Sequence, residues 1–239
     1  MENMLTLSVL GWIDGLTATG VVLFGLIFGS FFIYKSKKSE ANILKYLGLA
    51  TIFAGLMYLG VFLDFLIVVI TENNIENTDG IVALLSYIWL APAIITSIYI
   101  GTRLLSLKKK WYLLSIFVVL GIIFDVIIFL DPFSAFDFNP PTTSGEALID
   151  YNVNTFSFAG ILMAIFLLSV TIILGLGFLI KSLKSTGVLR KKLFLISIGA
   201  FSFCIFGLIE GLTAPDIYVV IIRIGYIASF WLLYFGLKS

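Results

Sequence analysis

Long apolar stretches, separated by short polar segments, run through the whole chain. Seven of these stretches can each form a membrane-spanning helix, because about 20 residues that rise about 1.5 Å each cross a hydrocarbon core roughly 30 Å thick. The predicted spans are residues 6–33, 43–70, 81–105, 111–131, 155–180, 193–213 and 216–237. The pattern predicts an all-α integral membrane protein, in which residues 1–239 form a single domain that is a seven-helix transmembrane bundle.

The charged residues of the polar segments alternate in sign from one segment to the next. Basic residues gather on one side of the predicted membrane: Lys35, Lys37, Lys38, Lys45, Arg103, Lys108, Lys109, Lys110, Lys181, Lys184, Arg190, Lys191, Lys192 and Lys238. Acidic residues gather on the other side, whose loops contain no Lys or Arg: Glu72, Glu76, Asp79, Asp131, Asp137, Glu146, Asp150 and Asp216. Because short basic loops are retained in the cytoplasm, the N-terminus is predicted outside and the C-terminus in the cytoplasm of a multi-pass plasma-membrane protein.

Composition narrows the classes of function. Hydrophobic residues make up 60% of the chain, charged residues 12%, and the mean hydropathy is +1.13, so the expected partner is the lipid bilayer. A net charge of +1 gives no field that attracts nucleic acid. The absence of histidine removes the usual haem ligand and the three-histidine zinc site of seven-helix membrane hydrolases. Cys204 lies in an apolar stretch and is expected in the core, and neither a metal nor a cofactor is predicted.

A short internal repeat relates the two halves of the chain. Five residues recur with the same spacing further along the chain: Phe32, Lys35, Ser36, Lys38 and Ser39 recur as Phe178, Lys181, Ser182, Lys184 and Ser185. At the same offset Asp64 matches Glu210. One interpretation is that spans one to three and five to seven are parallel repeats joined by the fourth span. The other is that two basic loops between apolar helices resemble each other without any repeat.

The longest polar segment, residues 132–154, is too polar and too rich in turn residues to span the membrane. On the outer side it would be either a solvated connector or a lid over the mouth of a pocket. Two further features predict kinks inside spans, namely Pro92 in the third span and the stretch around Gly175 and Gly177 in the fifth.

Five ionisable residues lie inside the predicted spans: Asp14, Asp64, Asp125, Glu210 and Arg223. A charge near the centre of a span costs about 2.5 to 3.5 kcal/mol on insertion scales, so these side chains should face the bundle interior or a watered cavity. Counted from the outer helix ends, all five lie roughly 5 to 12 Å deep, and we expect one layer in the outer half. The only base in this layer is Arg223, which shares a helix face with Tyr226. Its first expected partner is Glu210, because a tight turn joins spans six and seven, and Asp64 is the second.

This charged layer has two interpretations. It is either a structural ion-pair network that fixes the helix register, or the wall of a water-accessible concavity that opens outward. Four carboxylates that share one arginine would give the concavity a net negative charge. Such a site favours a cation or an amine, or binds protons.

The number and orientation of the spans resemble microbial rhodopsins and G-protein-coupled receptors, but residues 217–237 contain no lysine to hold retinal. Two three-helix repeats around a linker helix are similar to the SWEET and PQ-loop sugar and amino-acid transporters, although spans one and five lack the Pro-Gln pair. Over its whole length the chain resembles the seven-helix membrane sensor modules that precede histidine kinases, and stand-alone seven-helix proteins of archaea. That resemblance implies ligand sensing with an output to a cytoplasmic partner.

Two functions follow from these patterns. The first is receptor-like sensing, in which a small solute or cation binds from outside and helix shifts reach a cytoplasmic protein, with residues 181–192 as the contact. Its candidate ligand-binding residues are Asp14, Asp64, Asp125, Glu210, Arg223 and Tyr226. The second is secondary transport of a small solute or cation, which needs a polar route through an inner half that offers only hydroxyl residues such as Ser97 and Ser197. Sensing is favoured, and an enzyme is not expected, because no nucleophile, base and orienting group converge.

Overall fold

The computed structural model describes residues 7–40, 42–105, 108–213 and 217–237, and this part of the chain is almost entirely helical. Its helices and strands follow in this order: α1 (Val9–Ser39), α2 (Asn42–Leu56), α3 (Leu59–Thr71), α4 (Ile81–Tyr87), α5 (Leu90–Leu104), α6 (Lys110–Leu130), α7 (Pro132–Ala135), β1 (Phe136–Asn139), β2 (Asp150–Val153), α8 (Phe158–Val170), the π-helical turn η1 (Thr171–Leu176), α9 (Gly177–Leu183), α10 (Gly187–Leu212) and α11 (Val219–Leu237). The predicted all-α class is therefore confirmed.

Six of the described helices, with α4 and α5 joined and α8 to α9 joined, are long and apolar enough to cross a membrane. They are Val9–Lys38, Ile81–Leu104, Lys110–Leu130, Phe158–Leu183, Gly187–Leu212 and Val219–Leu237. The pair α2 and α3 passes the same test together but is bent by 46° at its junction. Length and composition thus make this a multi-pass membrane protein with six candidate spans, or seven if the bent pair is one span.

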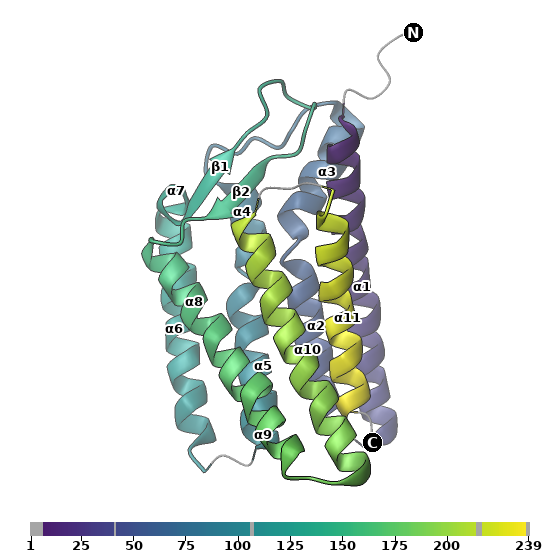
Figure 1. The fold of residues 1–239 in the computed structure, drawn as a ribbon. Coiled ribbons are helices and arrows are strands. Elements are labelled where there is room, and N and C mark those ends of the chain that lie inside the picture. The colour runs from purple at the N-terminus through teal and green to yellow at the C-terminus, as the bar shows by residue number, and fades with distance from the viewer. Residues whose placement is uncertain (1–6, 41, 106–107, 214–216, 238–239) are drawn as a thin grey trace.

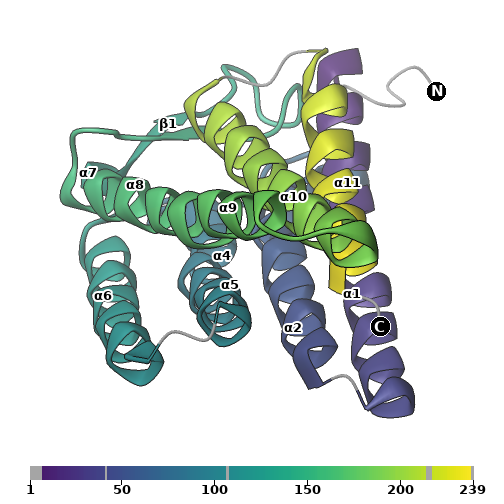
Figure 2. The same ribbon diagram turned by 60° about the horizontal axis from the view of Figure 1, so that its bottom comes forward.

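The helices run side by side along the bundle (Figure 1), and their contacts form a closed ring. In sequence, α1 packs on α2, α2 on α5, α5 on α6, α6 on α8, and α9 on α10, and α11 closes the ring between α10 and α1. Viewed from below, α1, α2, α5 and α6 stand in one row, and α8 to α11 cover one side of it (Figure 2). The β1–β2 hairpin lies at one end of the bundle, which we name the hairpin end (Figure 1).

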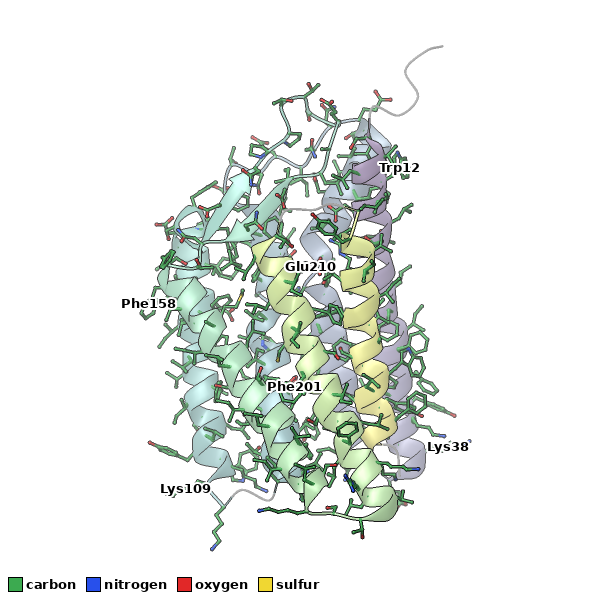
Figure 3. The ribbon with its side chains drawn as sticks, viewed as in Figure 1. Trp12, Lys38, Lys109, Phe158, Phe201 and Glu210 are labelled. Atoms are coloured by element: carbon green, nitrogen blue, oxygen red, sulfur yellow. The ribbon has the colours of Figure 1, made fainter. Side chains whose placement is uncertain are left out.

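Several helices extend beyond the apolar stretches that predicted them. The helix predicted to end at residue 33 continues to Ser39, and the one predicted to begin at residue 193 begins at Gly187. Lysine and arginine occupy both extensions, and they are good helix formers whose charged ends reach water. We name this end, opposite the hairpin, the basic end. Lys38 and Lys109 lie there (Figure 3).

The predicted second span is not one straight helix. The backbone N–H of Gly60 donates to the Ser86 hydroxyl of α4 at 3.0 Å, so it leaves the regular helical ladder at the α2–α3 junction. A Cβ on Gly60 would lie 1.8 Å from the carbonyl oxygen of Val82, so only glycine permits this close approach of α3 to α4. The bend therefore has a local chemical cause.

Regular α-helix is interrupted near both positions where kinks are predicted. Helices α4 and α5 separate at residues 88–89, just before Pro92, which lacks an N–H and whose ring crowds the carbonyl of Ile88. In the fifth span, the backbone around Gly175 forms the π-helical turn η1. Each of the two segments still counts as one span by length and composition.

Residues 132–154 are not a simple solvated connector. After α7, strands β1 and β2 pair antiparallel, with Phe136 opposite Val153 and Asn139 opposite Asp150. Phe136 and Val153 are buried, so the hairpin packs down on the helix ends. The Glu146 carbonyl also accepts a 2.8 Å hydrogen bond from the backbone N–H of Ser8, just before α1.

Candidate functional site

A cavity of about 100 Å³ lies at the hairpin end, between the helices and β2. Its walls come from α1, the α2–α3 junction, α4, β2, α10 and α11, so segments from the whole chain meet there. Four ionisable side chains, Asp14, Asp150, Glu210 and Arg223, line it together with five tyrosines. A volume of this size holds several water molecules or a small solute, since one water needs roughly 10–15 Å³ on the same measure.

Arg223 of α11 is the centre of the polar wall and is 5% exposed. Its Nε donates to Glu210 Oε1 at 2.8 Å, which is the ion pair that the sequence analysis expects first. Its Nη2 lies 2.7 Å from Asp14 Oδ1, an ion-pair contact that does not have the direction of a hydrogen bond. Its Nη1 donates at 2.6 Å to the carbonyl oxygen of Asp14 and, at the same distance, to the hydroxyl of Thr17. Arg223 therefore joins α1, α10 and α11.

Tyr58 connects this network to the bent span. It lies at the α2–α3 junction and is buried, with its ring stacked 5.0 Å from the Arg223 guanidinium. Its hydroxyl donates to Glu210 Oε2 in a short hydrogen bond. Both oxygens of Glu210 are thus occupied, one by the arginine and one by the tyrosine. A cation over an aromatic face is favourable by about 0.5–2 kcal/mol, so Tyr58 supports the position of the guanidinium as well as that of the carboxylate.

The lining has more acid than base. Three carboxylates face one guanidinium, and among the described residues no other charged side chain lines the cavity. Asp14 Oδ1 is buried and accepts no hydrogen bond from the described residues, although Arg223 Nη2 lies 2.7 Å away. With all four groups ionised, the wall keeps an excess of two negative charges, which an incoming cation can neutralise.

Five tyrosines line the same cavity: Tyr58, Tyr87, Tyr151, Tyr218 and Tyr226. Tyr226, predicted as a site residue, is 2% exposed and packs edge-on against Tyr58, with ring centres 5.8 Å apart. The closest partner of its hydroxyl is the sulfur of Met57 at 4.0 Å, which is at best a weak hydrogen bond. A buried hydroxyl with so poor a partner has hydrogen-bonding capacity for a molecule in the cavity.

The roof of the cavity is formed by Asp150 and Tyr151 of strand β2 and by Ile149, which directly precedes the strand. Burial raises the pKa of the Asp150 carboxyl above its ordinary value, and the negative charge of Asp14 raises it further. The Asn139 side chain and the Tyr151 backbone hydrogen-bond to this carboxylate and partly oppose the effect. Burial also raises the pKa of Tyr151, whose hydroxyl donates to Ser86 at 2.8 Å.

Asp64 does not reach Arg223, so the second expected partner of the arginine is wrong. Its carboxylate is fully buried and accepts three hydrogen bonds from the loops at the hairpin end. The donors are the side chain of Asn74 at 3.0 Å and the backbone N–H groups of Ile75 and Ile149, both at 2.8 Å. The carboxylate is therefore an anchor that ties α3 to both loops, and the residue does not line the cavity.

Asp125 also lies away from the cavity, so the five ionisable residues do not meet in one site. Its helix, α6, packs on α5 and α8 at the far edge of the bundle from α1 and α11 (Figure 2). Its Oδ1 is buried and has no hydrogen-bond partner in the described part of the chain. Depth in the membrane follows from the sequence, but the direction in which each helix faces depends on packing.

Several residues of the site are not predicted from the sequence. Asp150 is grouped there with seven other acids of the outer loops, and nothing distinguishes it until β2 places it over the cavity. Tyr58 and Ser86 are single polar residues in apolar stretches, where tyrosine and serine are common. The one usable signal is the position of Tyr58 next to Gly60, where the span bends.

Comparison of the chain with protein-family models, curated proteins and solved structures finds no significant match. Within the described ranges, no three His, Cys, Asp or Glu side chains are grouped so that they could hold a metal ion.

Proposed function

We propose that this protein is a receptor-like sensor of the plasma membrane that binds a small solute from outside. In this proposal it crosses the membrane seven times, with the hairpin end and the N-terminus outside and the basic end in the cytoplasm. Counting α2 and α3 as one bent span gives an odd number of crossings, in keeping with α1 beginning at the hairpin end and α11 ending at the basic end (Figure 1). The basic loops at the C-terminal end support this orientation.

The observation that carries the proposal is the position of the cavity against the α2–α3 junction. Tyr58 at the junction touches both Glu210 and Arg223, so a solute that changes this network acts directly on a bent helix. The roof is tied to the same helix twice. Ile149 donates to Asp64, and Tyr151 donates to Ser86, which in turn accepts from Gly60. A solute that contacts both the roof and the network of Tyr58, Glu210 and Arg223 would therefore interact with the bent α2–α3 span from two sides. If it binds more tightly to one position of that span than to another, it shifts the span toward that position.

The inner half of the bundle supports sensing more than transport. Below the cavity, Phe203, Tyr226 and Phe230 form an aromatic cluster with ring centres 5.1 to 5.7 Å apart. The next cavity inward is only about 20 Å³ and is lined mostly by aliphatic side chains. Ser97 lines this small cavity, and the hydroxyls of Ser97 and Ser197 each donate to a helix carbonyl. Sensing needs only a helix movement through this layer, whereas transport needs a polar route through it.

Secondary transport of a small solute or cation is the second candidate function. A broken helix beside a central polar site and a parallel repeat both occur in transporters. The contacts do not reproduce the repeat: Gly29 in α1 lies against Gly48 and Ile52 of α2, whereas its counterpart Gly175 lies against Phe201, which corresponds to Gly55. The matched pair Asp64 and Glu210 also bind different groups, so the repeat does not extend to the chemistry of the site.

A cytoplasmic protein is the proposed partner for the signal. Helices α9 and α10 meet at residues 184–187, where Lys184, Arg190 and Lys191 are exposed beside exposed Leu183 and Leu189. A surface of this kind fits an acidic partner with an apolar patch. A movement at the α2–α3 junction can reach the basic end through α2, and a change in the Arg223 contacts can reach it through α1, α10 and α11.

The proposal is tested with purified protein in lipid nanodiscs. Spin labels at Lys37→Cys and Arg190→Cys, in a Cys204→Ser background, report the distance between two helix ends at the basic end. A panel of small water-soluble cations, zwitterions, neutral molecules and anions is then added. At least one class of solute should raise the melting temperature and shift this distance. The variant Gly207→Leu, which fills the cavity from a position with free space, should lose both responses.

Two outcomes would contradict sensing. If no solute in the panel stabilises the folded wild-type protein, the cavity is not a binding site, since a ligand at 100 times its Kd stabilises by about 2.7 kcal/mol. If instead a solute binds and accumulates inside proteoliposomes under an imposed gradient, the protein is a carrier. The orientation is tested in intact cells with Ser144→Cys in the same Cys204→Ser background. If a membrane-impermeant thiol reagent labels this cysteine only after the cells are opened, the hairpin end lies in the cytoplasm and the proposed orientation is wrong.

A further inference from the structure

We propose that the ligand of the outer cavity is a small organic ammonium ion, bound between the carboxylates and the tyrosine rings. This inference rests on the proposed function, because it names the class of solute that the cavity takes. It is carried by three features of the cavity: an excess of carboxylate, a wall of aromatic rings, and buried polar atoms that lack good partners.

The charges disfavour an anion. Arg223 is the only cationic side chain among the lining residues, and its guanidinium already contacts two carboxylates at 2.7 and 2.8 Å. An anion would have to displace Asp14 or Glu210 and leave that carboxylate buried without its counter-ion, which is strongly unfavourable. The loops predicted to surround the entrance add further acids and contain no Lys or Arg, so their field attracts cations.

The carboxylates have room for a donor. Glu210 uses one oxygen for Arg223 and the other for Tyr58, so it holds the arginine in place. Asp14 and the roof carboxylate of Asp150 then remain to face a cation, and Asp14 Oδ1 is a buried acceptor that receives no hydrogen bond from the described residues. They lie on opposite elements, α1 and β2, and an ammonium group between them would neutralise the excess charge of the wall.

The tyrosines select an organic cation over a bare metal ion. Tyr87, Tyr151 and Tyr226 present rings to the cavity, and an ammonium group that carries methyl groups gains both cation–π attraction and apolar contact from such rings. The poorly partnered hydroxyl of Tyr226 adds one oxygen acceptor. The volume of about 100 Å³ limits the ligand to a compact molecule, such as a short amine or a quaternary ammonium ion.

A series of molecules with the same branched shape and different charge tests the inference. Choline carries a quaternary ammonium, dimethylbutanol replaces its nitrogen by carbon, dimethylbutanoate is the anionic counterpart, and glycine betaine is the zwitterion. Binding to the full-length protein in nanodiscs is measured by calorimetry and by thermal stabilisation. Two further cations, methylammonium and sodium, are tested as their chloride salts. Choline or methylammonium should bind at least about tenfold more tightly than the neutral, anionic and zwitterionic members, a difference of about 1.4 kcal/mol.

Two variants assign the binding to this cavity. Asp150→Asn removes the roof charge without touching the Arg223 ion pairs, and it should weaken choline binding about tenfold, as expected for a hydrogen bond or contact between charged groups. Asp137→Asn, on the exposed face of the neighbouring strand, is the matched control. It removes an equal charge from the same hairpin, and choline affinity should stay within about twofold of the wild type.

The outcomes separate this inference from the proposed function. If the neutral, anionic or zwitterionic member binds as tightly as choline, or only sodium binds, the ammonium assignment is wrong although the cavity still takes a solute. Equal losses in the two aspartate variants would also overturn it, because a general surface field would then explain the preference. If no molecule in either panel binds, the proposed function fails as well.

Discussion

Arg223 of α11 and Glu210 of α10 form an ion pair inside the protein, with 2.8 Å between Nε and Oε1. The same guanidinium contacts Asp14 at the other end of the chain at 2.7 Å. The attraction between a buried arginine and two carboxylates offsets the cost of removing these charges from water only while all three groups are present. A charged group that loses its partner still bears its full desolvation cost. This contact therefore fixes how the first and last helices meet, and it also forms one wall of the cavity.

Replacement of Arg223 by methionine should destabilise the protein by about 3–5 kcal/mol, since it leaves Asp14 and Glu210 buried without a counter-ion. Thermal unfolding in nanodiscs measures the loss. The triple variant Asp14→Asn, Glu210→Gln and Arg223→Met removes all the charges and should recover much of the stability. The control Arg190→Gln changes an exposed arginine at the basic end and should have little effect. Full stability of the single Arg223→Met variant would show that the network is not structural.

Asp64→Asn should loosen the roof of the cavity. Asparagine would keep one oxygen and place an NH2 donor at the other, facing either the N–H of Ile75 or the donors of Ile149 and Asn74, and one unsatisfied buried donor costs about 1–3 kcal/mol. Hydrogen exchange at the Ile75 or the Ile149 amide should become faster, while exchange in α10 stays slow. Glu76→Gln, an exposed acid of the same loop, is the control. Unchanged protection in Asp64→Asn would mean that the loops are held by other contacts.

Gly60→Ala and Gly20→Ala should have opposite effects although both place a methyl group on a helix. At Gly60 the new Cβ would lie 1.8 Å from the Val82 carbonyl oxygen, so α3 must move and stability should fall by at least about 1–3 kcal/mol. At Gly20 no atom lies within 4 Å, and alanine should be neutral or stabilising by up to about 1 kcal/mol. Melting temperatures of the two variants provide the comparison. Equal tolerance at both positions would contradict the close approach at the α2–α3 junction.

Choline binding should become tighter as the pH rises through the raised pKa of Asp150. The protonated form of this residue is neutral and the ionised form attracts the cation, so affinity is low below the pKa and high above it. The same raised pKa makes Asp150 stabilise the unliganded fold below its ordinary value of about 4, and this contribution is lost as the pH rises through the folded value. The charged and titratable groups that line the same cavity from other elements are Asp14, Tyr58, Tyr87, Glu210, Tyr218, Arg223 and Tyr226.

Calorimetry as a function of pH, in the wild type and in Asp150→Asn, measures this effect. The variant should lose the part of the pH dependence that lies just above the ordinary aspartate range. The same pH profile in both proteins would mean that another group controls the affinity. Asp137→Asn again serves as the control, because its side chain is exposed on the same hairpin.

The amino-acid sequence by itself determined the helices, their approximate ends, and the ion pair between Arg223 and Glu210. Apolar length and the spacing of charges set these features, and a tight turn between two helices limits which residues can meet. The resemblance to sensor modules and the inside-outside orientation stay predictions, since no comparison with known proteins bears on them. The lid interpretation of residues 132–154 gained support only when the hairpin was found over the cavity.

Only the tertiary structure decided which charges meet. Asp14, Asp64 and Asp125 lie at similar predicted depths, yet the first pairs with Arg223, the second anchors two loops, and the third lies on α6 away from the cavity, with one oxygen buried and without a partner among the described residues. Hydropathy reports how deep a residue lies along the membrane normal, but it carries little information on the rotation of a helix about its own axis. That rotation depends on contacts between residues far apart in the sequence, such as Gly60 with Val82, and these contacts also placed Tyr58 and Asp150 at the cavity.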